Sequence, residues 1–171
     1  MREVLVFAEC YANKFFAEEV KEKLEEAGFS YRLKTVHKLV YGRDRILCKA
    51  RRVLEERKNT LMLLFIDYEE GPLRRYVEDF FPNRENVAGF SSVYVGRSRF
   101  AENLVAVIFD PNIESALGVK ADRDRRILKT KHACRKLRSI LASRSRLVEE
   151  VASKIVSLIG GQSTSSRHPR T

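Results

Sequence analysis

The sequence predicts a three-layer α/β fold built on a mainly parallel sheet, and three observations support this prediction. Apolar runs of strand length alternate with segments of helical period between residues 3 and 109. Two of the runs, 61–66 and 104–109, are apolar throughout, which is typical of parallel strands covered on both faces. The chain has 171 residues and is 44% hydrophobic, which is enough for a packed core and excludes wholesale disorder.

The first half of the chain predicts two strand–helix pairs. Residues 3–8 form a short apolar, valine-rich run and are expected to be a buried strand. A helix is expected over 13–27, where apolar residues recur at helical spacing and Gly28 follows as a C-cap. Alternation predicts a second strand at 29–37, and helical periodicity returns over 43–58.

The central apolar run is followed by a short helix and two further strands. The helix is expected at 73–81, begun by Pro72 and ended by Pro82. Residues 88–95 are a weaker strand candidate, and 104–109 completes the series. The resulting order of strands and helices is that of a sheet with helices on both faces.

The chain is expected to divide into an α/β domain at 1–118, a basic helical region at 119–160 and a disordered tail at 161–171. The basic region predicts two helices. The second carries an apolar face over 147–158, which needs a surface to pack against. A homodimer formed through this face is one such arrangement.

All of the excess positive charge lies in the last third of the sequence. Residues 1–118 contain nineteen Lys and Arg against nineteen Asp and Glu, whereas 119–171 contain fourteen against four. The formal net charge is +10. This asymmetry favours a polyanionic partner, and nucleic acid, either DNA or RNA, is the expected one. A solvated basic helix is the alternative.

Several other classes of protein are excluded by the sequence. No apolar run is long enough to span a bilayer, and the N-terminal segment resembles a strand rather than a secretory signal. The three scattered cysteines fit a reduced, cytoplasmic protein without a disulfide framework. Motifs of the commonest hydrolases, zinc proteases, P-loop enzymes and dinucleotide-binding proteins are absent.

Each strongly apolar strand runs directly into a carboxylate. The first strand is followed by Glu9, the central strand by Asp67 and Glu69, and the late strand by Asp110 and then Glu114. Because the carboxyl ends of parallel strands meet at one edge of a sheet, these acids are expected to converge there. Independent helix-capping roles are the alternative for any single residue.

Carboxylates gathered in this way repel one another unless a cation compensates them. The hard cations Mg²⁺ and Mn²⁺ are bound by a few carboxylates completed by water and substrate phosphate. Such an ion polarises a phosphodiester and activates water. The sequence therefore predicts a Mg²⁺ or Mn²⁺ site at this edge.

The strand ending in Glu9, followed by a helix and by a second strand ending in Asp67-Tyr-Glu-Glu-Gly71, resembles a Toprim domain. Toprim domains form the catalytic fold of topoisomerases, primases and OLD-type nucleases, and the resemblance covers roughly residues 3–120. It implies a Toprim- or Rossmann-like sheet, with Glu9 as general acid/base or metal ligand and with Asp67 and Glu69 as the metal pair. Cys10 stands where the family usually has glycine, and Glu69 where it has a second aspartate. The segment 107–114 resembles a later acidic motif of such proteins, and Glu114 within it is the candidate ligand of a second metal site.

The expected function is therefore a metal-dependent nuclease that cleaves nucleic-acid phosphodiesters. Lys120 is a candidate to stabilise charge on the scissile phosphate. The candidates for binding the nucleic-acid backbone are Arg123, Arg125, Arg126, Lys129, Lys131, Arg135 and Lys136. The alternative is a non-catalytic α/β module that binds nucleic acid or a protein through the basic helices.

Overall fold

A computed structural model describes residues 3–28, 32–35, 43–56 and 60–160. The predicted tail at 161–171 lies outside the described residues, as do the ends of the predicted strand at 29–37 and the last two residues of the helix predicted at 43–58.

The chain folds as an α/β protein around one six-stranded sheet with the order β2-β1-β3-β6-β5-β4. The first four strands of this order are mutually parallel, and β5 and β4 continue the sheet in antiparallel fashion at one edge. A mainly parallel sheet was predicted from the sequence, and it is confirmed. The strands are β1 (Glu3–Ala8), β2 (Arg32–Thr35), β3 (Leu61–Asp67), β4 (Glu85–Val87), β5 (Phe90–Arg97) and β6 (Leu104–Phe109).

The C-terminal part contains more helices than the sequence predicted. Three helices replace the expected two, and a further single-turn helix precedes them. The loop at 129–132 separates two of these helices, each of which is too short for its periodicity to be recognised alone. The helices are α1 (Tyr11–Glu26), α2 (Arg43–Glu56), α3 (Pro72–Phe80), α4 (Ile113–Ala116), α5 (Asp122–Leu128), α6 (Ala133–Ala142) and α7 (Ser145–Gly160).

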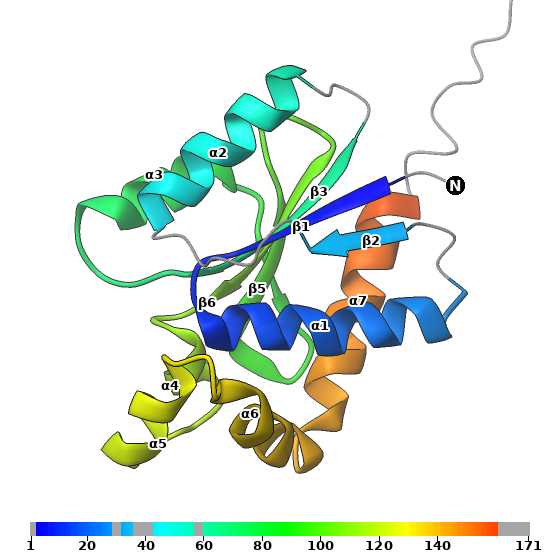
Figure 1. Ribbon diagram of the computed structural model, residues 1–171. Helices are drawn as coiled ribbons and strands as arrows, with labels where there is room; N and C mark the ends of the chain where they lie inside the picture. The colour runs from blue at the N-terminus through cyan, green and yellow to red at the C-terminus, as the bar shows by residue number, and fades with distance from the viewer. Residues whose placement is uncertain (1–2, 29–31, 36–42, 57–59, 161–171) are drawn as a thin grey trace, which may run out of the picture.

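Helices lie on both faces of the sheet (Figure 1). Alternate residues of each buried strand point to opposite faces, so Leu63 and Phe65 of β3 enter one core, and Leu64 and Ile66 enter the other. The first core is shared with α1, α6 and α7. The second is shared with α2 and α3.

The apolar face predicted at 147–158 finds its partner surface within the chain. Leu147, Val151 and Ile155 are fully buried in the same core as α1 and the sheet. These side chains therefore pack within the chain, and the homodimer expected through this face stays a prediction.

Within the described ranges, no helix combines the length and the apolar character needed to cross a membrane.

Candidate functional site

The parallel strands deliver three of the predicted acids to one edge of the sheet. Glu9 follows β1, and its N–H continues the pairing with β3 by donating to the carbonyl oxygen of Phe65 at 3.0 Å. Asp67 is the last residue of β3. Glu114 lies in α4, which begins four residues after β6 ends. The convergence expected from strand direction is therefore present for these three residues.

Asp67 lies at the centre of the cluster. Its carboxylate oxygen Oδ1 accepts hydrogen bonds from the side-chain amide of Asn13 at 3.2 Å and from the backbone N–H of Ile113 at 3.0 Å. Only 6% of Asp67 is exposed. One carboxylate thus joins the first turn of α1 to the start of α4.

Glu9 contacts the same strand end. Its Oε2 accepts a hydrogen bond from the backbone N–H of Asp67 at 2.9 Å, and the residue is half-buried. The next residue, Cys10, is the N-cap of α1, where its sulfur accepts from the N–H of Asn13. Glu9 is therefore the most solvent-accessible of the three clustered acids, which suits a group that exchanges protons.

Glu114 is 3% exposed, and its Oε1 is buried without a hydrogen-bond partner among the described residues. The Oδ1 of fully buried Asn13 is likewise unsatisfied there. Leaving buried oxygens unpaired costs free energy, typically 1–3 kcal/mol each. Two such oxygens beside two further carboxylates are a donor set that fits a hard cation.

The electrostatics of the cluster follow from burial and crowding of like charges. The pKa of Asp67 is raised from 3.8 to about 8, first by burial and then by the charge of Glu9, with a further contribution from Glu114. Burial also raises the pKa of the Cys10 thiol, and Asp67, Glu114 and Glu9 add to this effect. Cys10 is consequently a poor nucleophile.

Two of the predicted site residues lie outside the buried cluster. Glu69 is exposed in the loop after β3, so its carboxylate is solvated rather than buried beside Asp67. Lys120 is exposed beyond α4. Within the part of the chain that the structure describes, no three His, Cys, Asp or Glu side chains form a ready-made metal site. A metal ligand set would therefore have to be completed by side-chain movement, by solvent or by substrate.

The basic candidates fall into two groups. Lys136 forms an ion pair with Asp124 at 2.8 Å, and Arg125 donates to the carbonyl oxygen of Val119 at 2.9 Å. The remaining five are exposed on and around α5 and α6 and make no ion pair within the described ranges: Arg123, Arg126, Lys129, Lys131 and Arg135. We call these five the free basic patch.

Sequence reasoning missed the two groups that hold Asp67. Asn13 occupies the first turn of a helix, where a polar residue is unremarkable, and Ile113 contributes only its backbone. A second missed feature is Arg74, whose guanidinium lies 3.9 Å from the centre of the Tyr68 ring and 3.7 Å from Asp110. Arg74 thereby ties α3 to the turn that leads into α4.

Comparisons of the chain with family models, with curated proteins and with solved structures give no match.

Proposed function

We propose that this protein is a metal-dependent phosphodiesterase that acts on DNA or RNA, with a three-layer Toprim-like α/β domain. The observation that carries the proposal is the buried Oε1 of Glu114, which has no hydrogen-bond partner among the described residues and lies beside Asp67 and Glu9. Three converging carboxylates repel one another, and this repulsion lowers the stability of the folded protein. A bound cation would offset the repulsion.

In the proposed site, Asp67 and Glu114 hold Mg²⁺ or Mn²⁺, and Glu69 completes the ligand set from the solvent side. When bound, such a cation supplies Lewis-acid polarisation of the phosphodiester. Glu9 acts as acid/base, because it is half-buried and already held against the backbone of Asp67. Lys120 is proposed to stabilise the negative charge that develops on the phosphate.

The free basic patch is the proposed binding surface for the nucleic-acid backbone. Its five cations carry no intramolecular carboxylate within the described residues, so their full charge is available to phosphates. Arg125 and Lys136 remain proposed as weaker contributors, because each is already hydrogen-bonded or paired. The reduced cytoplasmic location is part of the proposal, and the free thiols of Cys10, Cys48 and Cys134 are compatible with it.

The test is a cleavage assay on single- and double-stranded DNA and RNA, with Mg²⁺, Mn²⁺ or EDTA. We expect cleavage that requires the metal, is lost in Asp67→Asn and Glu114→Gln, and falls by roughly 10²–10⁴-fold in Glu9→Gln. Glu70→Gln is the matched control, because Glu70 is an exposed carboxylate in the same loop.

Binding of the metal is measured separately from activity. Mn²⁺ is expected to raise the melting temperature of the unaltered protein but not of Glu114→Gln. Unchanged cleavage in Asp67→Asn would contradict the mechanism. Nucleic-acid binding without cleavage or a Mn²⁺ shift would instead favour the non-catalytic binding module.

A further inference from the structure

Aromatic side chains are exposed along one side of α3. Three large apolar side chains are strongly exposed in the described part of the chain, namely Tyr76 at 56%, Phe100 at 60% and Val156 at 37%. Tyr76 and half-buried Phe80 are four residues apart and so lie on the same side of α3. The Phe80 ring packs edge-on against Phe100, with 4.9 Å between ring centres. We call Tyr76, Phe80 and Phe100 the aromatic track.

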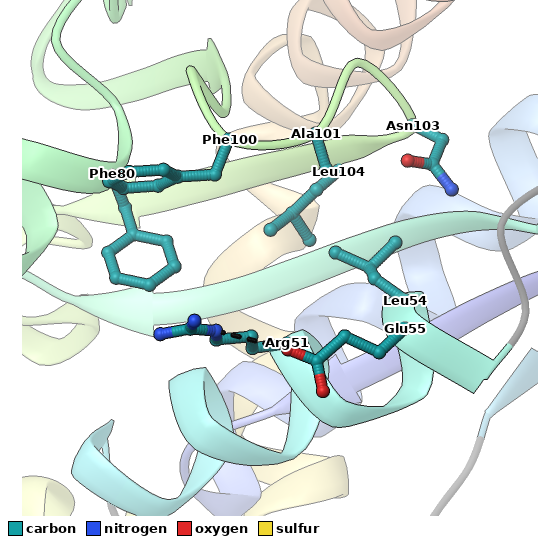
Figure 2. A pocket seen from close by; sticks show the side chains of 8 residues that line it. All are labelled: Arg51, Leu54, Glu55, Phe80, Phe100, Ala101, Asn103 and Leu104. Carbon is teal, nitrogen blue, oxygen red and sulfur yellow. Dashed lines mark hydrogen bonds and ion pairs between the residues drawn. The ribbon is translucent and has the colours of Figure 1, made fainter.

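The track ends at a cavity of about 580 Å³ between α2 and the turn that precedes β6. Figure 2 shows the rings of Phe80 and Phe100 together at one end of this cavity and Asn103 at the other. Leu54 and Leu104 supply apolar walls between them. A volume of this size, lined by aromatic and aliphatic groups, is large enough for a planar heterocycle.

Cations flank the aromatic track. The Arg99 guanidinium lies 4.8 Å from the centre of the Phe100 ring, and Arg75 is exposed beside Tyr76. Neither arginine makes an ion pair with a carboxylate in the described ranges. Arg51 lines the cavity and pairs with Glu55 at its rim. The track thus combines exposed π faces with two arginines that make no ion pair in the described ranges, and the carboxylate of Asp79 lines the same hollow as Arg75 and Tyr76.

The track lies at a distance from the candidate site. Helix α3 begins at Pro72, five residues after Asp67, so its first turn lies near the carboxyl edge of the sheet. The cavity lies at the start of β6, at the opposite edge. At 3.2–3.4 Å per residue, the six residues of β6 separate the two by roughly 20 Å. The track and the acidic cluster also lie on opposite faces of the sheet, because α3 packs in the core shared with α2, whereas Asp67 is held from α1 and α4.

We propose that the aromatic track binds single-stranded nucleic acid, with unpaired bases stacked on Tyr76 and Phe100, a base in the cavity, and phosphates on Arg75 and Arg99. In a duplex the faces of the bases are covered by the neighbouring base pairs. In a single strand the bases are free to stack on aromatic side chains. The inference rests on the proposed function and narrows its substrate to single strands, or to the single-stranded arm of a junction.

A protein surface could also cover exposed aromatic residues. Arg75 and Arg99 make no ion pair within the described residues. Burying them against an apolar protein face would leave their charges without a partner, so a polyanion is the favoured occupant. Self-association through the track is accordingly one of the outcomes of the test below.

The chain contains no tryptophan, which permits a direct probe of stacking. In Phe100→Trp, a short oligothymidylate or oligouridylate added in EDTA should quench the tryptophan fluorescence, and the same strand in a duplex should quench it far less. Val156→Trp is the matched control, because Val156 is exposed on α7, on the other face of the sheet. Equal quenching in both variants, or none in Phe100→Trp, would overturn the proposal.

Affinity gives a second measurement. Tyr76→Ala and Phe100→Ala should each weaken oligothymidylate binding by about tenfold, whereas Val156→Ala leaves it unchanged. Unaltered affinity in both track variants would refute the proposal, as would sedimentation showing a dimer that Phe100→Ala dissociates. Quenching in Phe100→Trp without metal-dependent cleavage would support binding at the aromatic track and contradict the proposed phosphodiesterase activity. If Tyr76→Ala and Phe100→Ala cleave single strands with an unaltered KM, the phosphodiesterase activity is supported and binding at the aromatic track is contradicted.

Discussion

At the scale of single residues, Asp67 is unusual because its environment opposes its own ionisation. Two donors stabilise its carboxylate, yet burial and the charges of Glu9 and Glu114 outweigh them, and its pKa rises to about 8. The folded protein therefore binds a proton at Asp67 more tightly than the unfolded chain does. This contribution to stability is complete below about pH 4, the unfolded value, and is lost as the pH rises through about 8.

Asp67→Asn should remove this pH dependence. The asparagine carbonyl can still accept from Asn13 and Ile113, but it carries no charge. Since one pKa unit corresponds to about 1.4 kcal/mol, we expect the metal-free variant to be more stable than the unaltered protein by about 2 kcal/mol or more at pH 8. The difference should shrink toward pH 4. Urea unfolding in EDTA across this pH range is the measurement, and a pH-independent difference would contradict the argument.

At the scale of elements, the short helix α4 brings Glu114 to Asp67. Asn112 is its N-cap, and the side-chain Oδ1 accepts from the N–H of Ser115 at 2.9 Å. The same turn presents the N–H of Ile113 to Asp67. A single-turn helix has little stability of its own, so its placement depends on this cap and on the Arg74–Asp110 contact.

Asn112→Ala should loosen α4. Loss of an N-cap typically costs about 1 kcal/mol of stability, which unfolding in urea can measure. We further expect Mn²⁺ to bind more weakly, because Glu114 is less firmly held. Asn112→Ser keeps a capping oxygen and is the control. If both variants bind Mn²⁺ as the unaltered protein does, α4 does not position a ligand.

At the scale of the whole molecule, the unpaired basic side chains and the clustered carboxylates of the described residues occupy separate regions. The free basic patch lies on α5 and α6, whereas the acidic cluster is enclosed by α1, β3 and α4. Lys136 and Arg138 show that not every cation of this region is available, since they pair with Asp124 and Glu19 at 2.8 Å each. Net charge alone therefore overstates the number of phosphate contacts.

The salt dependence of binding should distinguish free from paired cations. Replacing Arg126 and Lys129 by alanine should weaken nucleic-acid binding for every sequence and lower the slope of log K against log salt by about two. Replacing Lys136 and Arg138 removes the same charge but should lower the slope less. Equal slopes in the two double variants, measured by fluorescence anisotropy, would show that intramolecular pairing does not matter here.

The sequence by itself determined the α/β class and the edge at which the acids meet. Both follow from local rules, because apolar runs such as 61–66 define buried strands and parallel strands share a direction. The two-helix prediction for the C-terminal region was wrong, since a break between short helices has no periodic signal. The sequence likewise did not reveal which surface covers the apolar face of α7, because that surface is formed by segments distant in the chain.

Only the tertiary structure decided which side chains surround Asp67. Asn13 and the N–H of Ile113 are distant in sequence, and each has an ordinary local role. Tertiary packing also buried Glu114 and left Glu69 in solvent, although both are acidic residues that follow a strand. The physical reason is that burial, hydrogen bonding and pKa depend on the distances between segments, which the spacing of residues along the chain does not define.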